Sequence, residues 1–121
     1  MPVRSLRSSV LKWPNRESVD QAVRQWATDL AQARSDVSRI GYFGSYARGD
    51  WGVGSDLDIV IIVTDSQQPF IERAAAIDAT SLPVPADLLI YTEEEWGALD
   101  EQGKFYQTIM SEAICVLDKQ D

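Results

Sequence analysis

The first extended pattern of apolar positions predicts an amphipathic helix in the N-terminal third of the chain. From Val19 to Ala31, apolar residues recur at spacings of three and four, which is the period of one helix face. We expect this helix over about 16–35. Its cap is either Asn15 or a capping box of Ser18 and Gln21. Residues 1–14 are expected to form an irregular arm.

Short apolar runs further along the chain predict strands. The clearest run, Leu57–Val63, is apolar and β-branched almost throughout, so both faces of this strand should be covered. Further strands are expected at Ile40–Phe43, at Val84–Tyr91 and, closing the chain, at Ile114–Leu117.

The segments between these strands have helical patterns. We expect one helix from Pro69 to about Ser81, and another opened by Thr92, whose capping box uses Glu95. Gly103 should separate that helix from a last one. Helices alternate with strands, so we predict the α/β (α+β) class. The chain 1–121 should form a single domain with one small central sheet packed with helices.

The composition excludes several kinds of catalytic machinery. The chain has no histidine and one cysteine, Cys115, which rules out Ser-His-Asp or Cys-His catalysis, a His/Cys zinc site and an intrachain disulfide. Cys115 lies in the apolar run AICVL, where we expect a small core residue. Any catalysis must therefore use carboxylates, hydroxyls and basic side chains, with or without a hard cation bound by oxygen.

The charge is unevenly distributed along the chain. The net charge is −8; residues 1–49 carry 8 basic and 4 acidic residues, and residues 50–121 carry 3 and 15. Such an acidic chain is unsuited to direct nucleic-acid binding, because phosphate contacts need a basic face. No apolar run approaches the ~20 residues that cross a bilayer. We therefore expect a cytoplasmic protein with no membrane partner.

The acidic residues near the clearest strand point to a metal site. Asp56 and Asp58 are two positions apart at its start, so they should face the same way and repel each other. A divalent cation would remove this conflict, and oxygen-only ligation favours Mg²⁺ or Mn²⁺. Asp87 interrupts the next strand and would complete a carboxylate triad if the two strands are neighbours. The alternative is an Asp87 on an exposed edge or loop.

A glycine-serine turn precedes these carboxylates. Gly44 and Ser45 follow a strand, where free backbone N–H groups can hold an anion, and Arg48 can add positive charge. The alternative is a glycine-rich turn that merely joins two strands. Together with the acidic pair, the turn predicts a phosphate site beside a metal site.

The run Gly44-Ser45, ten residues, Asp56-x-Asp58, with the later Asp87, resembles the minimal nucleotidyltransferase (MNT) family of the DNA polymerase β superfamily, as found in HEPN/MNT toxin–antitoxin pairs. The resemblance extends to the closing run of Phe105, Ile109 and Glu112. It implies a mostly antiparallel mixed sheet like the polymerase β palm.

The resemblance also implies roles for these residues. Asp56 and Asp58 would bind the catalytic metals, and Asp87 would complete the site and assist deprotonation of the attacking hydroxyl. Gly44 and Ser45 would hold the phosphates of the nucleotide. We expect Arg48 and Ser55, which flank the same turn, to complete the nucleotide-binding residues.

The implied reaction transfers AMP from ATP, with Mg²⁺ or Mn²⁺, onto a hydroxyl group. Larger family members carry an added helical region for the acceptor, so here we expect a small helical partner protein to present it. A tyrosine of a HEPN-type toxin would be the acceptor, which makes the protein an antitoxin. Two alternatives are a small-molecule (antibiotic-type) acceptor and a non-catalytic module that occludes its partner.

Overall fold

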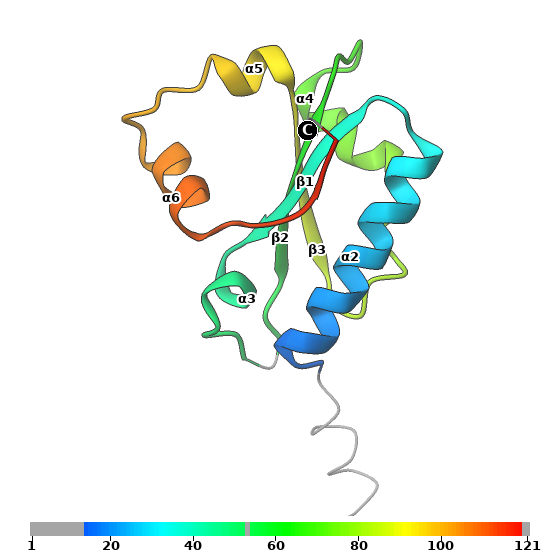
Figure 1. Ribbon diagram of the computed structural model, residues 1–121, viewed down its shortest axis with the longest axis vertical. Coiled ribbons are helices and arrows are strands. Elements are labelled where there is room, and N and C mark those ends of the chain that lie inside the picture. Colours follow the sequence, from blue (N-terminus) through cyan, green and yellow to red (C-terminus); the bar gives the residue numbers. More distant parts are fainter. Residues whose placement is uncertain (1–13, 53, 120–121) are drawn as a thin grey trace, which may run out of the picture.

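The computed structural model describes residues 14–52 and 54–119, which form a four-stranded mixed sheet with helices on both faces (Figure 1). The expected arm at 1–14 lies outside the described residues except for Pro14. The strands are β1 (Val37–Phe43), β2 (Leu57–Val63), β3 (Ala86–Thr92) and β4 (Ile114–Asp118). The helices are α2 (Arg16–Ala33), α3 (Ser45–Arg48), α4 (Phe70–Arg73), the 3-10 turn η1 (Ala74–Ala76), α5 (Glu93–Gly97) and α6 (Lys104–Glu112).

The strand order is β3-β2-β1-β4. β1 pairs antiparallel with both β2 and β4, and β2 pairs parallel with β3. The predicted class and the mostly antiparallel mixed sheet are therefore confirmed. The structure also shows that β2 and β3 are adjacent strands, which the proposed role of Asp87 requires.

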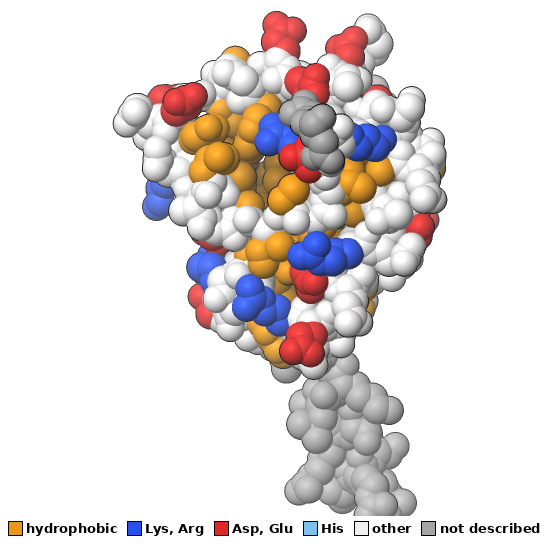
Figure 2. All heavy atoms as spheres, viewed as in Figure 1, with side chains coloured by type: hydrophobic (Ala, Val, Ile, Leu, Met, Phe, Trp, Pro, Cys, Tyr) orange, Lys and Arg blue, Asp and Glu red, His pale blue; other side chains and the backbone are white. Residues whose placement is uncertain are grey.

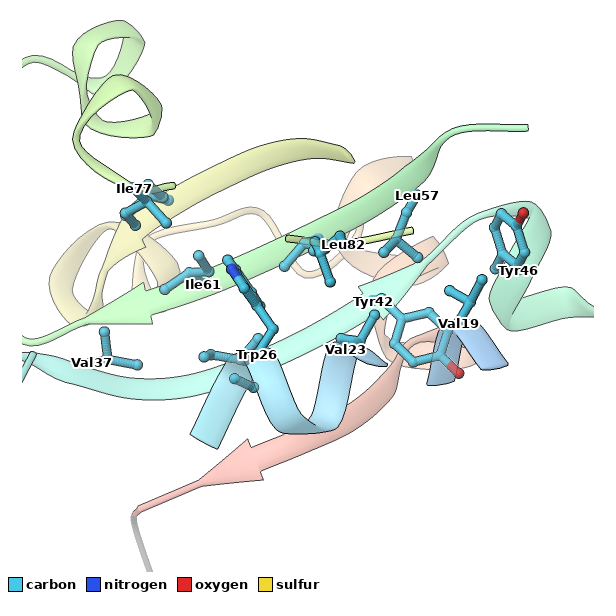
Figure 3. Close-up of a cluster of buried hydrophobic side chains, with 14 of the residues drawn as sticks. Val19, Val23, Trp26, Val37, Tyr42, Tyr46, Leu57, Ile61, Ile77 and Leu82 are labelled. Carbon is cyan, nitrogen blue, oxygen red and sulfur yellow. The ribbon is translucent and has the colours of Figure 1, made fainter. Parts of the chain in front are cut away.

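The main core lies between α2 and one face of the sheet (Figure 3). The predicted apolar stripe of α2 buries Val23 and Trp26 against alternate residues of β2, such as Ile61. The intervening residues Val60 and Ile62 are 6% and 4% exposed on the opposite face, so both faces of β2 are covered as its sequence predicts.

The opposite face of the sheet carries α5 and α6 (Figure 1). Hydrophobic side chains gather around a hollow on this side of the molecule (Figure 2), and its lining includes Val60, Ile62, Trp96, Ile109 and Met110. The two faces of the sheet thus differ: a long helix closes one, and two short helices leave the other partly open.

Several element boundaries differ from the sequence prediction. The helix expected at 69–81 ends at Ala76, because the Asp78 side chain accepts from the backbone N–H of Thr80 at 2.9 Å and forms a turn. The Asp78 carbonyl accepts from the indole N–H of Trp26 at 2.9 Å, which fixes that turn against α2. β3 begins at Ala86 and not at Val84. The intervening Pro85 has no N–H for a strand ladder.

The helix caps follow the sequence. Asn15 caps α2, since its side chain accepts from the N–H of Ser18 at 2.8 Å. The capping box of Thr92 and Glu95 is present at the start of α5.

Glu95 also forms an ion pair that the sequence analysis did not predict. Nη2 of Arg73, in α4, donates to Oε2 of Glu95 at 2.9 Å. The Arg73 side chain is only 7% exposed. The hydrogen bonds from Arg73 and then from the Thr92 backbone lower the pKa of Glu95 to about 2. This pair joins α4 to α5.

The prediction of a buried Cys115 is wrong. β4 is an edge strand, and Cys115 is exposed. Among residues 14–52 and 54–119, no helix is both long and apolar enough to cross a membrane.

Candidate active site

Asp58 and Asp87 are neighbours on the sheet. The parallel register of β2 and β3 pairs them directly, so both side chains project from the face opposite α2. They line one open hollow together with Phe43 and Phe105. The sheet therefore brings two of the predicted carboxylates side by side, one from each of the expected strands 57–63 and 84–91.

The electrostatic environment of Asp58 is unfavourable for its charge. Burial raises the pKa of Asp58, and the negative charges of Asp87 and Asp56 raise it further. Arg48 partly offsets this effect. Asp56 lies in the loop immediately before β2 and is exposed, yet it is near enough to act on Asp58. All three predicted carboxylates thus share one negative region.

This region suits a hard divalent cation in its chemistry. Every donor is a carboxylate oxygen, and a cation would relieve the repulsion that, in addition to burial, raises the pKa of Asp58. In the part of the chain that the structure describes, no three acidic or cysteine side chains are already gathered around a single point. Binding would therefore need the exposed Asp56 and Asp87 side chains to turn toward Asp58.

Gly44 brings the backbone against this carboxylate group. It follows β1 with φ +87°, a left-handed conformation that favours glycine. A Cβ atom at this position would collide with Oδ2 of Asp58. Glycine is therefore required here both by the backbone conformation and by the close approach of Asp58.

Gly44 and Arg48 both contact Glu112 at the end of α6. The Gly44 N–H donates to Oε2 of Glu112 at 3.3 Å, and Nη1 of Arg48 donates to the same oxygen at 3.1 Å. Arg48 also pairs with Asp50 at 3.0 Å. In the sequence, only the family resemblance points to Glu112. Its position three residues after the buried Ile109 was the one signal that it faces the sheet.

The two predicted serines lie near the turn. Ser45 begins α3, and its carbonyl accepts from the N–H groups of Gly49 and Asp50 at 2.9 and 3.1 Å. The Ser55 hydroxyl accepts from the Gly52 N–H at 2.8 Å, so it closes the loop that leads into β2. Nucleotide binding by either serine stays a prediction.

A nucleotidyltransferase domain family matches residues 23–116, a range that includes the turn, β2, β3 and α6. No curated protein matches the chain by sequence.

Solved structures share the fold. A Sulfolobus solfataricus protein described as a nucleotidyltransferase has a TM-score of 0.63 and 15% identity, over 88% of this chain and 86% of that one. A toxin–antitoxin structure with AMP-PNP has a TM-score of 0.58 and 20% identity, over 80% and 74%. A mutant of the toxin–antitoxin MntA-HpeT has a TM-score of 0.55 and 17% identity, over the same shares.

These structures are too distant in sequence to show more than the fold, but the family match spans most of the chain and includes the site. It agrees with the resemblance drawn from the Gly44-Ser45 turn and the paired aspartates. The chain belongs to the nucleotidyltransferase domain family.

Proposed function

We propose that the protein is a metal-dependent nucleotidyltransferase of the MNT type, which transfers AMP from ATP to a tyrosine hydroxyl of a small helical HEPN-type toxin. The observation that carries this proposal is the direct pairing of Asp58 with Asp87 beside Gly44, in a chain that belongs to the nucleotidyltransferase domain family. Paired carboxylates next to a close backbone turn are suited to holding a nucleotide triphosphate and a cation together.

The proposed roles follow from where each side chain lies. Gly44, Ser45, Arg48 and Ser55 bind the nucleotide, since they surround the turn between β1 and β2. Asp56, Asp58 and Asp87 would hold Mg²⁺ or Mn²⁺. When bound, such an ion neutralises charge on the phosphates during transfer.

The transfer is a substitution at the α-phosphorus of ATP. The acceptor oxygen forms a bond to this phosphorus, the bond to the bridging oxygen breaks, and pyrophosphate leaves. Asp87 receives the proton of the acceptor hydroxyl, because it is exposed at the open edge of the site where an acceptor can approach. Asp58, which is half-buried, would remain a ligand of the cation during this step.

The choice of ATP and of a protein acceptor is supported by the structural relatives. One of them is a toxin–antitoxin with AMP-PNP and another is MntA-HpeT, and both share this fold. The hydrophobic hollow beside α6 adds a surface that a partner protein could cover. A non-catalytic module that only occludes its partner is the second candidate, because this same surface would serve it without any transfer.

The test is transfer of a label from ATP. The protein is incubated with Mg²⁺, a lysate of its source cells, and ATP labelled at either the α- or the γ-phosphate. Compared with the same lysate without the protein, we expect additional label from the α-phosphate to remain on a protein after denaturation, and no additional label from the γ-phosphate. Mass spectrometry should find the added AMP on a tyrosine. Asp58→Asn should abolish labelling, whereas Asp65→Asn, an exposed carboxylate beyond the far end of β2, should not.

The other outcomes identify the alternatives. Label from the α-phosphate on a new small molecule, distinct from ATP, ADP and AMP, would identify a small-molecule acceptor. If no label is transferred, and a toxin bound by the protein regains its activity after separation, the protein acts by occlusion and the proposal of transfer is wrong.

A further inference from the structure

Glu112 accepts hydrogen bonds from Gly44 and Arg48, the donors that the proposed function assigns to the phosphates. Its Oε2 atom accepts from the Gly44 N–H at 3.3 Å and from Arg48 at 3.1 Å. The Glu112 side chain is 19% exposed, and it adds one more negative charge near Asp58. A single carboxylate oxygen therefore accepts hydrogen bonds from both the backbone N–H and the guanidinium at the turn.

A phosphate oxygen and a carboxylate oxygen can accept the same hydrogen bonds from these donors. Both are anionic acceptors, and the single N–H of Gly44 points to only one of them at a time. On the basis of the proposed function, we propose that Glu112 is an internal competitor of the nucleotide: its carboxylate holds Gly44 and Arg48 in the free protein and must release both when the triphosphate binds.

The surrounding contacts allow this exchange without unfolding of α6. Ile109 is 4% exposed and anchors the helix to the sheet, and Phe105 packs edge-on against Phe43 with 6.2 Å between ring centroids. These contacts do not involve the Glu112 carboxylate. Rotation of one side chain at the end of the helix is therefore sufficient for release.

Arg48 also has a second partner that keeps it near the turn. Its Nε atom donates to Asp50 at 3.0 Å, while Nη1 is the atom that Glu112 holds. Release of Glu112 thus frees one end of the guanidinium for phosphate, and Asp50 continues to hold the other end. Arg48 would then have an anion on both sides, before and after nucleotide binding.

If Glu112 competes with the nucleotide, its substitution should change nucleotide affinity in the opposite direction to the change expected from a purely structural role. If Glu112 only supported the turn, its loss would weaken nucleotide binding. If Glu112 competes, Glu112→Gln should tighten the binding of ATP with Mg²⁺ and of inorganic pyrophosphate. We expect a dissociation constant about 3- to 10-fold lower, since one like charge is removed next to a highly charged ligand.

The measurement is titration calorimetry with a non-hydrolysable ATP analogue and with pyrophosphate. Glu101→Gln is the matched control, because it removes the same charge from an exposed position just before α6. This control should bind like the wild type. Melting temperatures of all three proteins are recorded, so that a change in binding is not confused with a change in folding.

Each outcome separates this inference from the proposed function. If the wild type binds ATP and a folded Glu112→Gln variant binds it equally or more weakly, the competition is wrong and the proposed function stands. If the variant binds more tightly but no protein transfers AMP, the competition stands and the proposed transfer is wrong. If no protein binds either ligand, both are wrong.

A second measurement uses the wild type alone and does not depend on how the variant folds. In nuclear magnetic resonance titrations with the ATP analogue, the Gly44 amide and the Glu112 side-chain carboxyl signals should shift with the same midpoint. A Glu112 signal that stays constant while Gly44 shifts would overturn the competition.

Discussion

Asp58 is a residue whose charge does not favour the folded state. Its pKa is raised because it is partly buried and faces Asp87 and Asp56. A raised pKa in the folded protein means that the neutral form is the better fit, so ionisation at neutral pH costs folding free energy. This arrangement is typical of a functional carboxylate, since packing alone does not explain it.

Asp58→Asn should therefore stabilise the metal-free protein at pH 7. The amide mimics the neutral carboxyl, so we expect a higher free energy of unfolding and a higher melting temperature than those of the wild type. The sign follows from the raised pKa: the penalty is absent below the ordinary pKa of 3.8 and grows as the pH rises through the folded value. Thermal melts at pH 3 and pH 7 should show the gain only at pH 7; a loss of stability at pH 7 would contradict this explanation.

Gly44 is the second residue whose identity is tightly constrained. Gly44→Ala puts a Cβ onto the Asp58 carboxylate and an alanine at φ +87°. We expect destabilisation of about 1–3 kcal/mol in urea unfolding, together with loss of nucleotide binding. Gly97→Ala is the control, because no atom lies within 4 Å of a Cβ there. Equal effects of the two substitutions would show that the contact with Asp58 is unimportant.

At the scale of elements, the short helices α4 and α5 depend on each other. Each has only a few residues, too few to be stable alone. The Arg73–Glu95 pair and the donation from Arg73 to the Ile90 carbonyl at 3.0 Å join both helices to β3. The buried guanidinium of Arg73 therefore links α4 to α5 and to β3.

Glu95→Gln should expose this dependence through pH. The folded pKa of about 2 lies below the ordinary value of 4.5, so the stabilisation is complete above pH 4.5 and is lost as the pH falls toward 2. At pH 7 we expect a loss of about 1–2 kcal/mol, moderated because the Glu95 side chain is 41% exposed.

The wild type and Glu95→Gln are compared by urea unfolding at pH 7 and pH 3. The difference between them should shrink at the lower pH. Glu94→Gln removes a neighbouring exposed charge of the same helix and should behave like the wild type at both pH values.

Elements with strong local signals were predictable from the sequence. The β2 run and the α2 stripe were confirmed because burial on defined faces determines their patterns. The placement of Asp87 beside Asp58 was also confirmed, since the two strands are neighbours. Its catalytic role stays a prediction.

The contacts that were missed join distant parts of the chain. Arg73 meets Glu95, and Gly44 meets Glu112, only after separate helices have packed on the sheet. Local sequence does not reveal either pairing, although the spacing of Glu112 from Ile109 indicates that Glu112 faces the sheet. The exposure of Cys115 likewise depends on β4 being at the sheet edge, which its own apolar residues do not indicate.

In the molecule as a whole, the main core and the candidate site lie on opposite faces of one sheet. The core is closed by α2 on one side (Figures 1 and 3). The strand register places Asp58 and Asp87 on the other side, where Gly44 approaches Asp58. Ligands that bind the open face should therefore add to the stability of the whole fold without rearranging the core.

ATP with Mg²⁺ should raise the melting temperature of the intact protein. At a ligand concentration of 100 times the dissociation constant, linkage gives about 2.7 kcal/mol. Excess EDTA should remove most of this rise, and Asp58→Asn should show little of it. An identical rise in EDTA would contradict a shared nucleotide and metal site. The measurement is a thermal melt at fixed protein concentration.

The parallel register of β2 and β3 also determines where this chain can tolerate changes in length. The pairing of Asp58 with Asp87 depends on the strand residues themselves and not on the segment 64–85 that connects them. Insertions in that connection should leave the two carboxylates together. A single residue inserted in β3 before Asp87 would turn its side chain toward α2. Homologous sequences that keep this site should therefore vary in length between the strands and remain constant within them.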